Sequence, residues 1–410
     1  MRTIAHGVMT ASLVLALAGC TAMEEAPGPE RSTVPATGAA RVPELTASAV
    51  RTLDGTGAAP FDSERTVQAP PGWTVTVWAR IDSARLLAWT PDRQLLVSRP
   101  KFGDVIALTP GADGSAPAQR TLLSGLNQPH GLAFAGDTLY VAESDQINSY
   151  AYRNGQVTGR KIVVDGLPDD KSPDLRGAYS HALKSVAIGK DGSIYVSVGS
   201  TGNISVQDRD ATPQRATILR APAGGGTPTV YARGVRNGTG LAVDPDGAVW
   251  TAVNHRDNIQ YPHERDYDGD GTKDNGDVIQ AYVNDHPMEQ LARLTEGREL
   301  GWPYCNSEAD VNPGAPDSPL SYSGRPFVLD LETNVDGSKL DCAKLPPVEQ
   351  GMGAHSAPLG LSFVTGPGLA GGTAPARSSA STARGTATRR APRRCRSSPG
   401  ATARSARSRL

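Results

Sequence analysis

Short apolar runs alternate with polar turns along the middle of the chain. β-Branched and aromatic residues flank Gly-Asp or Asp-Gly turns in several of these segments, which predicts β-hairpins. Helical periodicity is visible only around MEQLARLTEG (288–297), so the pattern predicts an all-β protein. Five segments share the order of apolar run, polar turn and second apolar run: RLLAWTPDRQLLVS (85–98), HGLAFAGDTLYVAE (130–143), KSVAIGKDGSIYVSV (184–198), GTGLAVDPDGAVWTAV (238–253) and APLGLSFVTG (357–366).

The spacing of these segments is typical of propeller blades. Taking Leu86, Gly131, Ser185, Gly240 and Gly360 as equivalent positions gives intervals of 45, 54, 55 and 120 residues. Recurrence at about 45–60 residues, with a small meander in each unit, indicates a β-propeller. Because the last interval is about twice the others, we expect one divergent unit near residues 290–310. The sequence therefore predicts a six-bladed β-propeller over residues 66–372, with its last blade incomplete.

The first 20 residues resemble an export signal. Met1 and Arg2 are followed by the apolar run VMTASLVLALAG, which is too short to span a membrane. The LAGC sequence resembles a bacterial lipobox, which implies that Cys20 is lipidated and anchors the protein to the periplasmic or extracellular face of the cell envelope. A plain cleaved signal is the alternative. Residues 21–65 are rich in Pro, Ala, Gly, Thr and Glu, a composition that predicts a flexible tether.

Charge and cysteine content narrow the class of protein further. All 42 acidic residues but only 31 of the 41 Lys and Arg residues precede Thr373, so residues 1–372 carry a net charge of −11. An acidic body is a poor binder of nucleic acid. Export permits disulfides. With Cys20 lipidated and Cys395 in an unusual tail, Cys305 and Cys342 are a candidate pair; two unpaired thiols are the alternative.

Polar side chains with catalytic potential precede the repeated hairpins. His130, His181, the pair Arg236 and Asn237, and His355 occupy equivalent loop positions in four of the five units. Propellers bind ligands at the mouth of the central channel, so we expect these residues to converge there. Together they offer a general base with cationic and amide donors, which suits an anionic, oxygen-rich ligand. No nucleophile elbow, phosphate loop or Cys-x-x-Cys pair is found in the sequence.

Three segments resemble the soluble glucose/sorbosone dehydrogenase family. They are SHALKSVAIGKDGSIYVSVGSTGN, VRNGTGLAVDPDGAVWTAVN and GWPYC, in the order found in that family. The resemblance extends from about Trp73 to Gly372. Members of this family, with the related pyranose dehydrogenases, are six-bladed propellers that use pyrroloquinoline quinone and Ca²⁺ to oxidise sugars.

The resemblance implies roles for particular residues. His181 matches the base that takes the hydroxyl proton of the sugar while hydride moves to the quinone. Arg236 and Asn237 match the pair that contacts the quinone. Residues 254–259 (NHRDNI) loosely match the loop whose backbone oxygens bind the Ca²⁺ of the cofactor. From its charge and position, Lys184 is expected to meet a cofactor carboxylate.

A second calcium signal lies in DYDGDGTKDNGD, residues 266–277. Acidic residues occupy loop positions 1, 3, 5, 9 and 12, and Gly271 stands at position 6. This is the arrangement of an EF-hand loop, in which hard oxygen ligands surround Ca²⁺. The last ligand is Asp instead of Glu and no flanking helix is evident; a solvated acidic loop is the alternative. The expected ligands are Asp266, Asp268, Asp270, Thr272 and Asp277.

The end of the chain does not fit the family. Residues 373–410 contain ten Arg, no Lys, Asp, Glu or aromatic residue, and are expected to be disordered. The family's GxHGSWNR motif is missing after Gly372. However, residues 377–390, back-translated with permitted codons and read two bases later, give LVGLHGSWNRDPP. We interpret the tail as a frame-shifted product; a genuine tail that binds membranes or polyanions is the alternative. Such a chain exposes sheet edges, and we expect marginal stability and weak quinone binding.

These observations predict a quinone-dependent sugar or polyol dehydrogenase whose only contact with the membrane is the lipid anchor. A Ca²⁺-dependent sugar lactonase is one alternative; it would need a Glu and several Asn or Asp residues around one central metal. A non-catalytic propeller that binds a protein or glycan is another. The sequence identifies neither the sugar nor the electron acceptor.

Overall fold

The computed structural model describes residues 45–175, 177–363 and 380–381. The expected export signal with Cys20, most of the expected tether and nearly all of the Arg-rich tail lie outside the described residues. None of the described helices is long and apolar enough to cross a lipid bilayer. The part of the expected tether that is described is not a tether: β1 (Thr46–Thr52) pairs with β2 (Thr66–Ala69) and β3 (Val75–Val77) in a three-stranded sheet. Because Thr, Ser and Val favour extended backbone even when exposed, this segment can pair although it has no apolar period.

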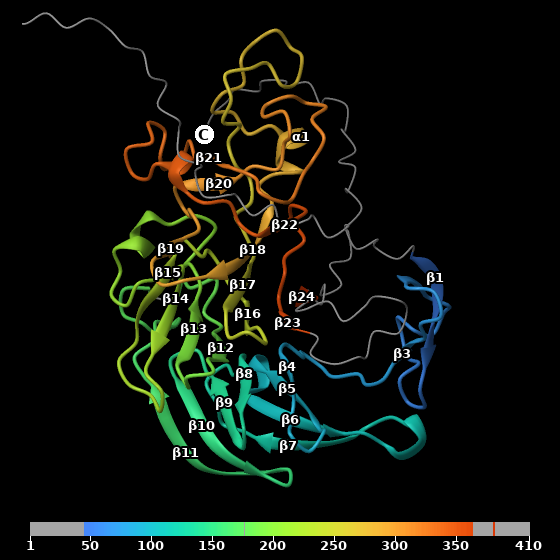
Figure 1. Cartoon of the computed structure of the whole chain (residues 1–410). Helices are drawn as coiled ribbons and strands as arrows, with labels where there is room; N and C mark the ends of the chain where they lie inside the picture. Colours follow the sequence, from blue (N-terminus) through green and yellow to red (C-terminus); the bar gives the residue numbers. More distant parts are fainter. Residues whose placement is uncertain (1–44, 176, 364–379, 382–410) are drawn as a thin grey trace, which may run out of the picture. The chain divides into compact units, whose positions relative to one another are not determined.

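Four sheets of antiparallel strands follow one another along the chain, as expected of propeller blades (Figure 1). Each begins at one of the repeated segments, and each hairpin predicted in the middle three segments is present. The blades consist of β4 (Leu87–Trp89), β5 (Leu95–Arg99), β6 (Asp104–Thr109) and β7 (Ala118–Leu123); of β8 (Leu132–Ala135), β9 (Thr138–Ala142), β10 (Ile147–Arg153) and β11 (Gln156–Val164); of β12 (Ser185–Ile188), β13 (Ile194–Val198), β14 (Thr217–Ala221) and β15 (Thr229–Arg233); and of β16 (Gly240–Val243), β17 (Val249–Val253), β18 (Glu289–Leu294) and β22 (Gln350–Met352).

The first strands of successive blades lie next to one another, because β4 contacts β8, β8 contacts β12, β12 contacts β16 and β16 contacts β23 (Ser362–Phe363). Glycine is required just before the first strand of the second blade. A Cβ on Gly131 would lie 2.7–2.9 Å from backbone atoms of Lys184, Ser185 and Val186, and the Gly131 N–H donates to the Lys184 carbonyl. Gly131 therefore allows the backbones of the second and third blades to touch.

Apolar side chains fill the spaces between the blades. Both faces of a blade face another blade, so central strands are buried throughout; all five residues of β13 are buried. At the first blade, however, Leu87 and Trp89 of β4 are 56% and 60% exposed. A blade packed against β4 would cover such side chains.

The expected divergent unit near residues 290–310 is not a separate blade. Its first part is β18, the third strand of the fourth blade, where the apparent helical period is overridden by pairing with β17 and β22. The long interval comes from two insertions. One lies between β17 and β18 and holds α1 (Gln280–Val283); the other lies between β18 and β22. The described residues thus form five blades, the fifth represented by β23 and its short pairing with β24 (Ala380–Ser381); a sixth is not confirmed.

The second insertion adds short elements to the outer end of this blade. Its strand β19 (Arg298–Glu299) pairs with β15, and β20 (Cys305–Ser307) pairs with β21 (Phe327–Leu329). The remaining helices, all of the 3₁₀ type, are η1 (Pro100–Phe102), η2 (Ala112–Gly114), η3 (Val206–Arg209) and η4 (Cys342–Lys344). A disulfide joins Cys305 and Cys342, the candidate pair, with Cα atoms 5.7 Å apart.

Replacing Cys305 and Cys342 together by Ser is expected to lower the free energy of unfolding by about 2–4 kcal/mol, because the bond closes a loop with a sequence separation of 37 residues. Chemical denaturation of wild type and double variant, both without reductant, measures the difference. Equal midpoints and equal slopes would contradict this role for the bond.

Candidate functional site

The loops that precede the first strands of the third, fourth and fifth blades contact the loops that follow the second strands of the third and fourth blades. They carry His181 before β12, residues 199–205 after β13, Arg236 and Asn237 before β16, residues 254–259 after β17, and His355 before β23. A Cβ on Gly199 would lie 2.5 Å from the His181 Cβ and 3.0 Å from the Asn237 Oδ1. The structure therefore brings these two side chains together across a glycine.

His181 is held in one tautomer. Its Nδ1 lies 3.0 Å from the Ser200 carbonyl oxygen and 2.9 Å from the Ser200 Oγ. The Ser200 hydroxyl donates to the Gly202 carbonyl at 2.7 Å, so both Ser200 atoms can only accept from the imidazole. Nδ1 thus carries the proton. Burial, followed by the nearby charge of Arg236, lowers the pKa of His181 to about 4, and the neutral ring keeps the lone pair of Nε2 available as a base.

Arg236 joins the loops after β13 and β17. Its guanidinium donates to the carbonyls of Asn203 (3.1 Å), Asn254 (3.1 Å) and His255 (2.6 Å), and to the Asn203 side-chain oxygen (3.1 Å). The side chain is buried, and burial lowers its pKa. Two of the backbone oxygens in residues 254–259, the loop expected to face Ca²⁺, therefore face this cation instead.

His355 is the second cation of the site. Its Nδ1 lies 3.0 Å from the Asp257 Oδ1, and its Nε2 lies 2.7 Å from the Val283 carbonyl oxygen. Both ring nitrogens face acceptors, and the hydrogen bond that the ring donates to Asp257 raises the pKa of His355. Asp257 is tied in turn to Asn203 by two hydrogen bonds. The predicted residues His181, Arg236, Asn237 and His355 thus belong to one connected group.

A buried carboxyl lies beside this group. Glu289, the first residue of β18, accepts a hydrogen bond from the His255 N–H at 2.5 Å, and the Ala357 N–H lies 3.4 Å from its other oxygen. Burial raises the pKa of Glu289 to about 7. Close to it, the Nε2 of fully buried His255 has no hydrogen-bond partner among the described residues.

His130 and Lys184 are not at this site. His130 is 1% exposed and its Nδ1 bonds the Lys184 carbonyl at 3.0 Å. Lys184 is fully buried; its ammonium donates to the Ala182 carbonyl and lies 4.8 Å from the centre of the Tyr179 ring. Burial lowers the pKa of Lys184 to about 7. The His130 imidazole lies at the seam between β8 and β12, whereas the Lys184 ammonium lies against the Ala182 carbonyl and the Tyr179 ring.

Replacing His130 by Gln is expected to make stability less sensitive to acid. Burial lowers the pKa of His130 from 6.5 to about 4, so between these values the unfolded chain binds a proton that the folded chain does not. Stability is therefore lost as the pH falls from about 6.5 towards 4. Denaturation at several pH values should show a slope smaller by up to about 1.4 kcal/mol per pH unit in the variant. An unchanged slope would show that His130 is protonated in the folded state.

The acidic loop has a different set of neighbours from the expected one. Carboxylate oxygens of Asp266, Asp268 and Asp274 lie within 4.8 Å of one another. Asp270 instead accepts from the Thr272 N–H at 2.8 Å and hydroxyl at 2.7 Å. Asp277 does not belong to this group of carboxylates; its backbone carbonyl accepts from the Tyr261 N–H at 2.8 Å.

A family model described as TrAA12-like matches residues 67–391. The chain belongs to the TrAA12-like family. This membership agrees with the resemblance found in the sequence. A comparison with curated proteins finds no match.

Two solved structures are similar in fold to this TrAA12-like chain. One is the holo form of the pyranose dehydrogenase PQQ domain from Coprinopsis cinerea, with a TM-score of 0.57 and 20% identity over 72% of each chain. The other is the calcium structure of the carbohydrate-active enzyme family AA12 protein from Trichoderma reesei, with a TM-score of 0.54 and 21% identity. That match covers 69% of this chain and 71% of the other. At such identities the similarity shows the shared propeller fold.

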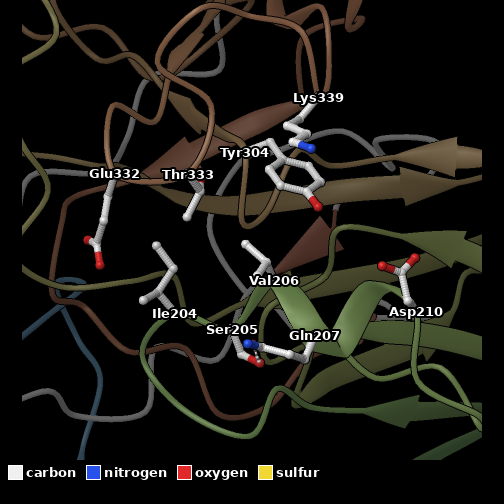
Figure 2. A pocket seen from close by; sticks show the side chains of 9 residues that line it. All are labelled: Ile204, Ser205, Val206, Gln207, Asp210, Tyr304, Glu332, Thr333 and Lys339. Atoms are coloured by element: carbon white, nitrogen blue, oxygen red, sulfur yellow. Dashed lines mark hydrogen bonds between the residues drawn. The ribbon is translucent and has the colours of Figure 1, made fainter.

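An open cleft of about 580 Å³ lies next to the site, starting at the residue after Asn203. Figure 2 shows the η3 segment on one side of it, with Tyr304 and Lys339 opposite. Neither His181 nor Arg236 lines this cleft, so the cleft lies beside the group of predicted residues and does not contain it. Its lining residues are Ile204, Ser205, Val206, Gln207, Asp210, Tyr304, Glu332, Thr333 and Lys339.

Three residues of the site were missed by sequence analysis. Asn203 stands in the quoted segment that ends VGSTGN, and Asp257 stands in NHRDNI, yet neither precedes a repeated hairpin. Glu289 lies in the segment read as helical. A search for polar residues at the ends of the first two strands of each blade, as well as before them, would have found Asn203 and Asp257.

Proposed function

We propose that the chain is a sugar or polyol dehydrogenase that uses pyrroloquinoline quinone, with His181 as the base. The observation that carries this proposal is the fixed tautomer of His181. Its Nδ1–H is committed to Ser200, its ring is neutral, and its Nε2 is left to accept a proton beside two cationic side chains. Membership of the TrAA12-like family and the printed descriptions of the similar structures support the same class of reaction.

The donor set fits a planar quinone with several carboxylates. Arg236 and His355 supply positive charge, Asn237 supplies an amide, and the unpartnered Nε2 of His255 is a buried polar atom near them. The N–H groups of Arg236 and His355 bond the loops, so these two side chains favour carboxylates through their charge, while Asn237 and His255 can donate hydrogen bonds. In this conformation Lys184 and His130 bond the backbone carbonyls of Ala182 and Lys184 and none of these donor residues.

Each of these residues then has a defined role in the oxidation of the sugar. When bound, the quinone supplies the two-electron acceptor that takes hydride from the carbon of the alcohol. Nε2 of His181 accepts the hydroxyl proton, so the C–O bond gains double-bond character as the C–H bond breaks. Ser200 keeps the imidazole in the basic tautomer, and Arg236 fixes the loops after β13 and β17 around it. His355 adds a positive charge that favours an anionic ligand.

Two measurements test this proposal in order. Resequencing the gene across the codons for residues 369–390 shows whether the chain continues into LVGLHGSWNR or ends in the Arg-rich tail. The product of the verified gene is then assayed for sugar-dependent dye reduction with added quinone and Ca²⁺, with circular dichroism to confirm folding. We expect turnover that requires both sugar and quinone. A folded product that neither binds quinone in a spectroscopic titration nor reduces the dye would overturn the proposal.

One observation bears on the lactonase alternative. Glu289 lies near Asp257, Asn203 and Asn254, which resembles the acidic and amide ligands that such an enzyme would need. The guanidinium of Arg236 bonds the backbone oxygens of two of these residues, Asn203 and Asn254. A cation already fills the centre of the group, and this disfavours a divalent metal there.

We also propose that the acidic loop binds Ca²⁺ through Asp266, Asp268 and Asp274. Three clustered carboxylates offer the hard oxygen ligands that Ca²⁺ prefers. Adding 5 mM Ca²⁺ to metal-free protein should raise Tm by several degrees in the wild type and have little effect on Asp268→Asn, because binding to the folded state alone stabilises it. Asp317→Asn, an exposed change in the other insertion, is the control. Equal shifts in both variants would exclude this loop as the Ca²⁺ site.

A further inference from the structure

A second cluster of metal-ligating side chains is buried between the two insertions of the fourth blade. It consists of His286, which follows α1, and of Glu308 and Asp310, which follow β20. The His286 Nε2 lies 3.0 Å from the Glu308 Oε1 and 3.4 Å from the Asp310 Oδ1. At most 4% of any of these side chains is exposed. No residue of the quinone site belongs to the cluster.

Two polar atoms of the cluster have no hydrogen-bond partner. They are the His286 Nε2 and the Asp310 Oδ2, and both are fully buried. Two carboxylate oxygens lie at ion-pair distance from Nε2, yet neither contact has the geometry of a hydrogen bond. Leaving such groups unpaired inside a protein costs about 1–3 kcal/mol each. A ligand that accepts electron pairs from both nitrogen and oxygen would satisfy them together.

We propose that His286, Glu308 and Asp310 bind a divalent first-row transition metal of the zinc class. One imidazole and two carboxylates suit Zn²⁺ or Mn²⁺, whereas Ca²⁺ takes oxygen ligands. Atoms bound at about 2.0–2.1 Å in a tetrahedral zinc site stand roughly 3.3 Å apart, which agrees with the two measured separations. The fourth position is left for water or a further ligand.

The surroundings of the cluster orient its members as a metal site requires. The His286 Nδ1 donates to the Tyr282 carbonyl at 2.9 Å, which leaves Nε2 as the ligand atom, and the Tyr282 ring stacks on the imidazole with centroids 3.9 Å apart. Glu308 accepts from the Asp310 N–H at 2.8 Å and bonds the His263 Nε2 at 3.1 Å. Outer partners of this kind fix the ring and carboxylate orientations in metal sites.

A second open cleft lies beside the cluster. Its volume is about 560 Å³, and His263 lines it together with Pro262, Phe327 and Asp341. The hydrogen bond from His263 to Glu308 places a single side chain between this cleft and the buried ligands.

The proposed metal would tie α1 to β20, two elements that belong to separate insertions. The carbonyl of Val283, the last residue of α1, accepts the hydrogen bond that holds His355 in the quinone site. The metal is thus placed to stabilise the insertions and, through α1, the position of His355. This inference does not depend on the proposed reaction.

The test uses the full chain without quinone or sugar. Metal content is measured by mass spectrometry after purification, and Zn²⁺, Mn²⁺ and Ca²⁺ are each titrated into chelator-treated protein. We expect one zinc-class ion per chain, a Tm raised by roughly 5 °C or more by Zn²⁺ at saturation, and little effect of Ca²⁺ at this cluster. Asp310→Asn should weaken Zn²⁺ binding at least about 100-fold, while Asp317→Asn and the acidic-loop variant Asp268→Asn keep it.

Several outcomes would overturn the proposal. Wild-type protein that binds less than about a tenth of an equivalent of Zn²⁺ or Mn²⁺ would show instead that His286 is protonated between the carboxylates. Equal Zn²⁺ affinity in wild type and Asp310→Asn would place the metal elsewhere. If Asp310→Asn does not fold, the wild-type titration and the spectrum of a Co²⁺-loaded sample decide, since a bound imidazole and carboxylates give a tetrahedral cobalt spectrum that free Co²⁺ lacks.

Discussion

Replacing His181 by Asn is expected to lower kcat for sugar oxidation about 10²–10⁴-fold, the range that a positioned general base contributes. Asn fills a similar volume and can still donate to Ser200, but it has no atom that accepts a proton near neutral pH. Because Arg236 and Asn237, the proposed quinone-binding residues, are left in place, the affinity for quinone should change by less than about threefold. Steady-state kinetics with saturating quinone, together with a quinone titration, separates the two effects.

Ser200→Ala provides the matched control for this variant. It removes the hydroxyl partner of Nδ1 but leaves the Ser200 carbonyl, 3.0 Å away, to hold the same tautomer. We expect a loss of only a few-fold in kcat, and no change in the quinone titration. If His181→Asn keeps more than about a tenth of wild-type kcat, the imidazole is not the base.

The blade pattern of the fold could be read from the sequence because it is local. A hairpin such as Ile188 to Ile194 requires only a polar turn and flanking apolar residues, and these are visible within one segment. Insertions are not local. The 120-residue interval before Gly360 looked like a missing blade, whereas the structure places β16 and β23 side by side with both insertions outside the repeat. Strand β1 was missed for a related reason. Its own composition does not indicate a strand, and its extended conformation is stabilised by pairing with β2 and β3.

The sequence predicted residues of the site only through their position in the loops before the first strands. His181, Arg236, Asn237 and His355 share a position before the first strand, and the structure brings them together. His130 has the same position in sequence, but its imidazole turns into the seam between β8 and β12 to bond Lys184. A single sequence carries no signal for that rotation, because it depends on the neighbouring blade. Asp274 was recognised as an acidic loop position but not as a ligand, since the loop departs from EF-hand geometry.

Replacing Arg236 by Lys is expected to weaken quinone binding at least about tenfold and to lower the free energy of unfolding by about 2–5 kcal/mol. The guanidinium satisfies the carbonyls of Asn203, Asn254 and His255 in directions that one ammonium cannot reproduce. Each buried carbonyl left without a donor costs about 1–3 kcal/mol. Because Lys keeps the positive charge, the losses of quinone affinity and of stability measure the contribution of the directed hydrogen bonds of the guanidinium. Chemical denaturation and a spectroscopic quinone titration measure the two effects.

Arg233→Lys is the matched control, since Arg233 ends β15 on the same connection to β16 and is exposed. We expect a change below about 0.5 kcal/mol in that variant. The stability and the quinone affinity of Arg236→Lys also distinguish a structural role of Arg236 from a role in binding the ligand. Loss of stability with unchanged quinone affinity would make Arg236 a purely structural link between the loops after β13 and β17. Loss of affinity in a chain of wild-type stability would mean that its hydrogen bonds to the loops are replaced by water in solution, and that the guanidinium acts on the ligand directly.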